Sequence, residues 1–239
     1  MNRSTRTRSE IQPDRRRPSE VARHVVLPAD IRTTGWPRVE AQARACGIEY
    51  DGWQRQLGRC ILGKTSDGVY AAGIGGVVVS ICRQVGKTFL IGTMIVMLCI
   101  LNEYPLKVLW TAHRTRTSDE TFKFMCALVR RKAISRFVDG EPRRANGQQE
   151  IVFVNSSRIM FGARENGFGR GFDSVDVEVF DEAQILTERA LDDMIPATNA
   201  APNPLIIYMG TPPKPSDPSE VFSTCLLYTS PSPRDRQKS

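Results

Sequence analysis

The sequence predicts an α/β fold built around a mostly parallel, doubly wound sheet. Four short apolar runs have the length of buried strands, and helical segments separate most of them. A Gly-Lys-Thr triplet follows the first run closely, and an Asp-Glu pair ends the third. Alternating strands and helices favour a parallel sheet with helices on both faces. The two polar motifs therefore fall where predicted strands end.

Length and composition place the chain among ordinary globular proteins. It has 239 residues, of which 41% are apolar and 25% charged, so disorder throughout is excluded and one or two domains are expected. A chain of this size buries roughly 70% of its unfolded surface and needs no disulfides. The cysteines form no C-x-x-C pair, which argues against a disulfide framework or a zinc site. They are Cys46, Cys60, Cys82, Cys99, Cys126 and Cys225. A reducing cytoplasm is the expected location.

No targeting or membrane segment is predicted. The longest apolar run begins at Phe89 and ends at Leu101, which is shorter than the roughly eighteen residues of a membrane span. It indicates a buried core helix instead. The N-terminal arginines are followed by no apolar segment, so no secretory signal is expected.

Most of the net charge of +7 lies at the two ends of the chain. Residues 1–24 carry +4 and residues 225–239 carry +2, which leaves +1 for everything between them. Residues 1–30 are polar, rich in arginine and interrupted by proline, so we expect a disordered basic leader there. Such a leader either contacts phosphates or is a solvated tail, and the charge alone does not decide between these two interpretations.

The first predicted element is a strand at the β-branched run Val77-Val78-Val79. A single folded domain is expected over residues 31–224. In chain order, the expected elements are a strand at 77–80, a helix at 87–102, a strand at 107–111, a helix at 118–131, a hairpin of strands 150–155 and 158–161, a loop at 162–171, a strand at 175–180, a helix at 187–195 and a strand at 205–209.

The Gly86-Lys87-Thr88 triplet has the residue types of a phosphate-binding loop. Gly86 lets successive backbone N–H groups face phosphate oxygens, Lys87 supplies a positive charge to the β- and γ-phosphates, and Thr88 offers a hydroxyl to Mg²⁺. The full pattern requires a glycine where this chain has Ile81. A second triplet, beginning at Gly63, lacks a strand before it and an apolar helix after it, so we interpret it as a coincidence.

The Asp181-Glu182 pair ends the third predicted strand, about ninety residues after the triplet. Asp181 is predicted to hold Mg²⁺, and Glu182 to orient or deprotonate the water that attacks the γ-phosphate. Two acids at a strand end are common on their own. Their order after a phosphate-binding loop makes the pair a Walker B candidate.

Two further motifs flank this core. Gly210-Thr211, after the fourth strand, is predicted to sense the γ-phosphate, although a simple exit turn has the same composition. Trp53-Gln54 precedes the loop, and its glutamine is predicted to read the adenine edge. In most proteins, however, such a pair is an ordinary core tryptophan beside a surface glutamine, with no ligand.

Taken together, the four motifs resemble the N-terminal ATPase domain of the large terminase subunit of tailed bacteriophages, over residues 45–222. The resemblance implies a P-loop NTPase fold of the additional-strand catalytic-glutamate type. It implies that Arg83 and Gln84 belong to a variant phosphate-binding loop, in which the first glycine of the usual pattern is replaced. It also implies an arginine near the γ-phosphate, with Arg83 and Arg170 as candidates and Arg164 as a weaker one.

The same resemblance implies ATP and Mg²⁺ as ligands and DNA packaging as the function. Expected partners are double-stranded DNA, the small terminase subunit, the portal protein and further copies of the chain in a ring, in the cytoplasm of the infected bacterial host. Members of the family carry a C-terminal nuclease domain, which we do not expect in this chain. Residues 225–239 resemble a translated sequencing adapter and are expected to be non-native.

Two other functions fit the motifs. A helicase-type DNA translocase shares the glutamine, the loop and the Asp-Glu pair but needs a second motor domain. A fragment that binds nucleotide or DNA without turnover would carry the same residues. Phosphate release and strand separation distinguish the three alternatives.

Overall fold

The computed structural model describes residue 22 and residues 25–145, 148–169, 171–214, 217 and 222–223. Most of the predicted leader, residues 1–21, 23 and 24, falls outside these residues, and the predicted tail falls wholly outside them. The strands are β1 (Thr33–Thr34), β2 (Gly63–Lys64), β3 (Val77–Ser80), β4 (Lys107–Ala112), β5 (Arg143–Ala145), β6 (Gln148–Val152), β7 (Arg158–Ala163), β8 (Val177–Phe180) and β9 (Leu205–Gly210). The α-helices are α2 (Trp36–Ala45), α3 (Gly52–Ile61), α4 (Lys87–Leu101), α5 (Thr115–Val129), α6 (Lys132–Ser135) and α7 (Glu188–Met194), and short 3-10 helices are η1 (Gly73–Gly75), η2 (Arg164–Asn166), η3 (Ala183–Ile185) and η4 (Ile195–Thr198).

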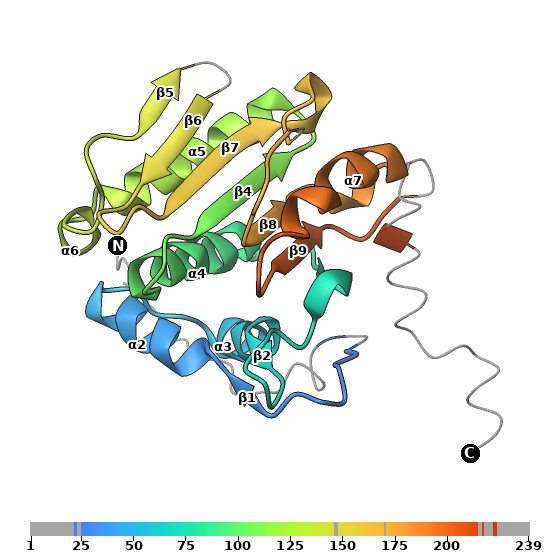
Figure 1. Cartoon of the computed structure of the whole chain (residues 1–239), viewed down its shortest axis with the longest axis horizontal. Coiled ribbons are helices and arrows are strands. Elements are labelled where there is room, and N and C mark those ends of the chain that lie inside the picture. The colour runs from blue at the N-terminus through green and yellow to red at the C-terminus, as the bar shows by residue number, and fades with distance from the viewer. Residues whose placement is uncertain are drawn as a thin grey trace, which may run out of the picture.

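A seven-stranded sheet in the order β3-β9-β8-β4-β7-β6-β5 forms the centre of the described residues (Figure 1). The five strands from β3 to β7 in this order are parallel, whereas β6 and β5 continue the sheet antiparallel. The strand β9 lies between β3, which leads to the Gly-Lys-Thr triplet, and β8, which ends at the acidic pair. This inserted strand confirms the predicted additional-strand arrangement.

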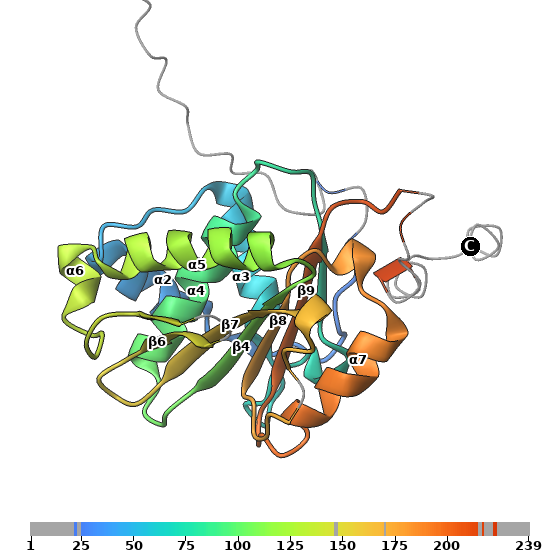
Figure 2. The ribbon, with the colours of Figure 1, turned by 90° about the horizontal axis from the view of Figure 1, so that it is seen from above.

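The two faces of the sheet pack against different helices. Helices α2, α3, α4 and α5 lie on one face, and α7 lies on the other (Figure 2). Alternate residues of each strand serve the two cores, as Val177 and Val179 do for the first and Phe180 for the second. Helix α4 is apolar all round because it is enclosed between the sheet and α2 with α3. The doubly wound arrangement is therefore confirmed.

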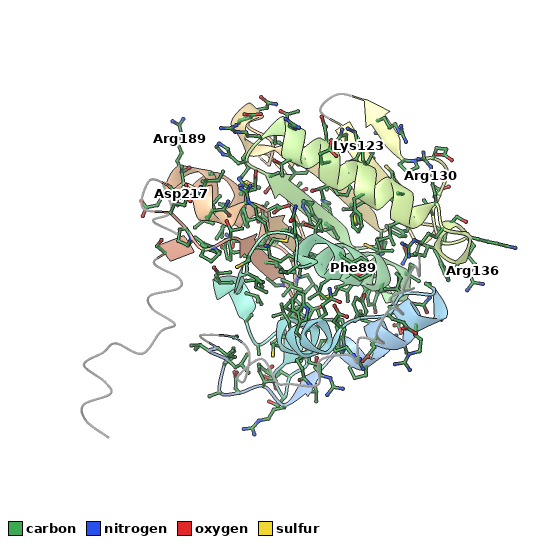
Figure 3. All side chains as sticks on the ribbon, turned by 180° about the vertical axis from the view of Figure 1, so that it is seen from behind. Phe89, Lys123, Arg130, Arg136, Arg189 and Asp217 are labelled. Atoms are coloured by element: carbon green, nitrogen blue, oxygen red, sulfur yellow. The ribbon has the colours of Figure 1, made fainter. Side chains whose placement is uncertain are left out.

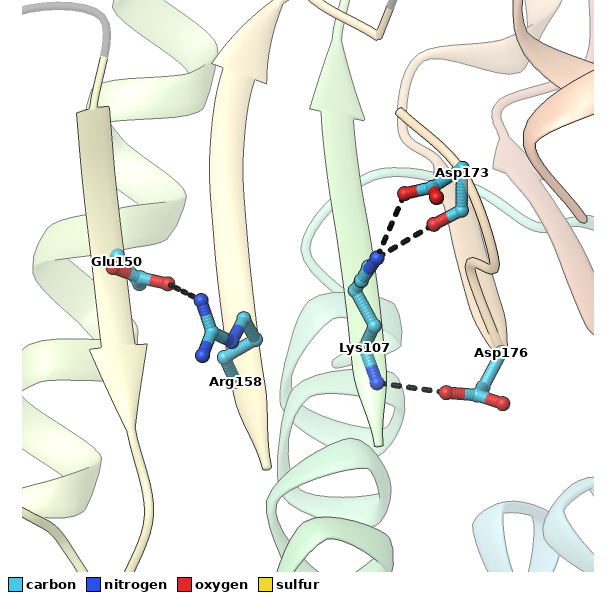
Figure 4. A network of polar contacts seen from close by, with 5 residues as sticks. All are labelled: Lys107, Glu150, Arg158, Asp173 and Asp176. Atoms are coloured by element: carbon cyan, nitrogen blue, oxygen red, sulfur yellow. Dashed lines mark hydrogen bonds and ion pairs between the residues drawn. The ribbon is translucent and has the colours of Figure 1, made fainter. Parts of the chain in front are cut away.

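Polar contacts fasten the beginnings of the central strands, at the edge opposite the motifs (Figure 4). The Lys107 ammonium donates to the backbone oxygen of Asp173 at 2.7 Å, and the Lys107 N–H donates to the Asp176 carboxylate at 2.8 Å. Arg158 and Glu150 pair across β7 and β6 at 3.4 Å. These contacts fix the strand entering the Asp-Glu pair relative to its neighbour β4.

Several predicted boundaries were wrong. The predicted hairpin is confirmed, because β6 and β7 pair antiparallel. Strand β7 also pairs parallel with β4 and extends to Ala163, so the predicted loop begins later. Strand β5 and helix α2 were not predicted. Helix α5 begins three residues before the predicted start, because the Glu165 carboxylate accepts from the Thr115 N–H at 2.8 Å and so caps the helix from a distant segment.

The second Gly-Lys-Thr triplet is not a phosphate-binding loop. Its first two residues form β2, which pairs antiparallel with β1 away from the central sheet. The five cysteines in the described residues have free thiols. Among the described residues, no helix is both long and apolar enough to cross a membrane.

A buried acid lies beneath the motifs, on the second face of β8. Glu178 is fully buried, and neither of its carboxyl oxygens has a hydrogen-bond partner among the described residues. Burial raises the pKa of Glu178 to about 8, and the nearby Arg164 offsets part of this rise. The folded protein therefore holds a proton on Glu178 at neutral pH.

We expect Glu178→Gln to make folding stability less dependent on pH. In the unfolded chain this carboxyl ionises near its ordinary pKa of 4.5, whereas the folded state keeps the proton up to about pH 8. Wild-type stability attributable to this group is full below pH 4.5 and declines as the pH rises toward 8, at about 1.4 kcal/mol per unit. Thermal melts at pH 5 and at pH 8.5 should show that the melting temperature of the variant rises relative to that of wild type at the higher pH. The exposed Glu188→Gln should show no such trend, and an equal difference at both pH values for Glu178→Gln would contradict the assignment.

Candidate nucleotide-binding site

A cavity of about 540 Å³ opens at the carboxyl ends of the central parallel strands. This is the edge at which open α/β sheets bind ligands. The cavity is lined by residues from the loop after β3, the ends of β8 and β9, and the first turns of α5. The lining residues used below are Arg83, Gln84, Gly86, Lys87, Thr88, Thr117, Glu120, Thr121, Asp181, Glu182, Gln184, Gly210 and Thr211.

The loop between β3 and α4 has the backbone of an anion-binding turn. Gln84 and Gly86 both have positive φ, at 62° and 93°, in a segment that reverses the chain into the first turn of α4. A side chain at Gly86 would also meet the Gln54 amide nitrogen at 2.9 Å. Position 86 therefore requires glycine for two reasons. The first N–H groups of α4 face the loop and are available to an anion.

The Lys87 ammonium is held over this loop. It donates to the backbone oxygens of Ile81 at 2.6 Å and Cys82 at 2.7 Å. Partial burial lowers the pKa of Lys87, and the negative charge of Asp181 opposes this effect. Lys87 and Asp181 thus line the same cavity and act on each other electrostatically.

The acidic pair is rigidly placed at the end of β8. The Asp181 N–H donates to the Thr111 backbone oxygen at 2.8 Å, and the Asp181 carboxylate accepts from the Glu182 N–H at 2.8 Å. Burial raises the pKa of Asp181 to about 6, and neighbouring Lys87 and Arg164 limit the rise.

Glu182 has the features of a strained functional residue. Its φ of 54° lies in the left-handed region, which is costly for a residue with a side chain. Its Oε2 atom is buried and has no hydrogen-bond partner among the described residues. A buried polar atom without a partner is rare in folded proteins, which together with the strain marks Glu182 as a functional candidate.

Arg164 lies behind the acidic pair and does not line the cavity. Its guanidinium donates to the backbone oxygen of Thr111 at 3.0 Å and to that of Asp181 at 2.8 Å, and it stacks over Phe180 at 5.9 Å. Burial lowers the pKa of Arg164 to about 10, although adjacent acids offset part of this. Arg164 therefore ties together the ends of β4 and β8 and positions Asp181. Arg83 lines the cavity, whereas Arg170 lies outside the described residues.

The end of β9 is linked to the acidic pair through Gln184, a residue that the motif analysis missed. The Gln184 side-chain oxygen accepts from the Thr211 N–H at 3.2 Å. A side chain at Gly210 would meet that same oxygen at 2.5 Å. Gly210 and Thr211 thus contact the segment that follows Glu182. Gln184 stands only two residues after Glu182, and this proximity was the available sequence signal.

Trp53 and Gln54 do not line the cavity. Trp53 packs against the hydrophobic core. Gln54 is buried: its oxygen accepts from the Asp51 N–H at 3.0 Å and caps α3, and its nitrogen donates to the Gly86 oxygen at 3.4 Å. Gln54 therefore buttresses the loop, while reading of adenine by this pair stays a prediction.

Helix α5 contributes a wall that the motif analysis also missed. Thr117, Glu120 and Thr121 line the cavity from its first turns. The sequence signal was the amphipathic pattern of the helix that follows β4. The carboxyl end of β4 lies beside the carboxyl end of β8. Without the strand order, nothing in the sequence placed this helix at the site.

The residues present fit a magnesium ion shared with phosphates. Thr88, Asp181 and Glu182 line one cavity. Mg²⁺ prefers oxygen ligands, uses one or two carboxylates and keeps several waters. In the described part of the chain, no group of three or more His, Cys, Asp or Glu side chains forms a metal site made by protein alone.

Comparisons with known proteins identify the fold. No protein-family model matches the sequence, and no curated protein matches it. The large terminase of bacteriophage HK97 matches with a TM-score of 0.60 and 18% identity, over 74% of this chain and 38% of that one. A mutant of the large terminase ATPase domain of Thermus phage P74-26 matches with a TM-score of 0.59 and 14% identity, over 76% of this chain and 71% of that one. The chain therefore has the P-loop NTPase fold of phage large terminase ATPase domains, and its match spans well under half the length of the HK97 protein.

Proposed function

We propose that this chain is the ATPase motor domain of a phage terminase large subunit, which couples ATP hydrolysis to the packaging of double-stranded DNA into procapsids. One observation carries the proposal. A phosphate-binding loop, an acidic pair and the end of β9 line a single cavity, on a fold shared with large terminase ATPase domains. The cavity volume suits a nucleotide.

Binding is assigned to the loop and the start of α4. The backbone N–H groups around Gly86 cradle the phosphates, and the helix dipole favours their negative charge. Lys87 exchanges its two carbonyl contacts for phosphate oxygens, which attract the ammonium more strongly because they are charged. Thr88 and Asp181 would hold Mg²⁺, which neutralises charge on the phosphates when bound.

Hydrolysis is assigned to Glu182. Its unpaired oxygen accepts a proton from the water that attacks the γ-phosphate, so that a P–O bond forms to that water while the bond to the ADP oxygen breaks. The strained backbone holds this carboxylate at the cavity wall. Arg83 and Arg170 are the candidates for stabilising charge in the transition state.

Coupling is assigned to the contact between Gln184 and Thr211. This single hydrogen bond joins the segment after Glu182 to the end of β9. Loss of the γ-phosphate changes what Glu182 and Thr211 contact, and the shared bond passes that change to the chain beyond β9. Trp53 and Gln54 are proposed to influence adenine binding through the loop.

The expected setting is the cytoplasm of an infected bacterium, with the small terminase subunit, the portal protein and further copies of this chain in a ring. These partners follow from the proposed family and not from the cavity.

The purified chain should release phosphate from Mg·ATP, with duplex DNA increasing the rate. With procapsids, it should protect duplex DNA from nuclease digestion in an ATP-dependent manner. A forked duplex distinguishes the alternatives: ATP-dependent strand separation would indicate a helicase-type translocase. Calorimetric ATP binding with no phosphate release, even with DNA present, would indicate a binding fragment without turnover.

A further inference from the structure

Six basic residues lie along the segment that runs from the end of α5 through α6 into β5. We call this set the basic corner: Arg130, Arg131, Lys132, Arg136, Arg143 and Arg144, all exposed. Residues 130–144 contain only two acids, Asp139 and Glu141, so the segment carries +4. The body of the chain as a whole is nearly neutral. The charge is therefore concentrated in one place and is not a general property of the surface.

Ion pairs neutralise only part of this charge. Arg130 pairs with Glu141 at 2.8 Å, and Arg143 pairs with Glu150 at 3.5 Å. The other four cations have no ion pair with a described carboxylate. Arg144 acts on the same Glu141, since both arginines lower the pKa of that carboxyl, Arg130 more strongly. Two cations therefore share one acid, and the corner keeps an excess of positive charge.

The corner stands on an ordered platform. Ile134 of α6 is fully buried in the main core, and the chain after α6 is held by the hydrogen bond from the Asp139 N–H to the Val152 oxygen at 2.8 Å. The Arg136 guanidinium lies 4.8 Å from the centre of the Phe137 ring. Figure 3 shows Lys123, Arg130 and Arg136 following one another along α5 and α6 at the rim of the molecule. The backbone that carries these cations is therefore ordered before any ligand binds.

The basic corner is separate from the nucleotide cavity. None of the six cations lines that cavity. On α5 the cavity lining ends at Phe124, and Arg130 lies six residues further along, about 9 Å of helical rise. Charge at this distance is not needed to hold the phosphates of one nucleotide. It suits a polyanion that presents phosphates over a wide surface, as duplex DNA does with one charge per about 1.7 Å of its axis.

We propose that the basic corner binds the phosphate backbone of duplex DNA. The inference deepens the proposed function and rests on it for the identity of the polyanion. The contact is with phosphates and carries no sequence preference of its own. The corner begins at the residue after α5, the helix whose earlier turns line the nucleotide site.

The test is a triple charge reversal, Arg131→Glu, Lys132→Glu and Arg136→Glu, in the full chain. Its matched control reverses three exposed arginines elsewhere, Arg38→Glu, Arg59→Glu and Arg189→Glu. Each triple lowers the formal net charge from +7 to +1 and leaves residues 1–24 intact. Binding to a duplex oligonucleotide is measured by fluorescence anisotropy across a salt series, with ATP hydrolysis measured without DNA in parallel. A triple glutamine variant at the corner covers the case in which the reversal fails to fold.

At low salt, the corner reversal should weaken duplex binding at least tenfold more than the control reversal. The glutamine variant should reduce the slope of log affinity against log salt by about 3, near 0.9 for each lost phosphate contact. Equal losses in the corner and control triples, or unchanged binding in the corner triple, would overturn the proposal. So would binding of an acidic polypeptide in preference to the duplex. Hydrolysis without DNA should be unchanged in all variants, and its absence in wild type would count against the proposed function and not against the corner.

Discussion

Lys87→Ala should reduce ATP turnover by at least about 100-fold, the scale of losing one charged group that stabilises a transition state. In the structure, the Lys87 ammonium lies over the loop carbonyls of Ile81 and Cys82 at the cavity wall. Its replacement removes the positive charge that the loop presents to phosphates, so ATP binding should weaken as well. Phosphate release and calorimetric ATP affinity measure the two effects.

The chain supplies its own control, because the same triplet occurs at Gly63. Lys64→Ala removes a lysine from an identical Gly-Lys-Thr sequence, yet Lys64 lies in β2 with its ammonium 5.4 Å from the centre of the Tyr70 ring. This variant should retain wild-type turnover. Equal losses in both variants would show that the effect comes from general destabilisation, and wild-type turnover in Lys87→Ala would remove the loop from the mechanism.

The contrast between the two triplets shows why the site could be found from the sequence. The triplet at Gly86 follows a β-branched run and precedes an apolar helix, and both elements formed as predicted. Strands β4, β8 and β9 were also predicted, because each is a nearly continuous apolar run, as buried parallel strands are. The order of the strands could not be read in this way, since each parallel strand has the same composition.

The errors lie where distant segments decide the local structure. Helix α5 begins early because Glu165 caps it from fifty residues away. The predicted hairpin of β6 and β7 formed, but the parallel pairing of β7 with β4 was not predicted. Arg164 was ranked last of the three arginines for contact with the γ-phosphate. Its contacts with Thr111 and Asp181 instead make it a positioning residue, which depends on β4 and β8 being adjacent.

Glu182→Gln should abolish turnover while ATP binding remains. A general base contributes about 10²- to 10⁴-fold to such a reaction, and the amide cannot accept the proton of the attacking water. The phosphate-binding loop, Thr88 and Asp181 are untouched by the change, so the Mg·ATP affinity should stay near wild type. Together with Lys87→Ala, which loses both properties, this variant separates binding from chemistry.

The exposed Glu188→Gln, at the start of α7, is the matched control and should leave turnover unchanged. The backbone at Glu182 strengthens the test, because its φ of 54° is unfavourable for glutamine as it is for glutamate. The substitution therefore changes the charge without relieving the strain, and the melting temperature should move little. If Glu182→Gln kept wild-type turnover with an unchanged melting temperature, the Glu182 carboxylate would not be the base. If it lost ATP binding together with turnover, the carboxylate would act on the bound nucleotide or its metal instead.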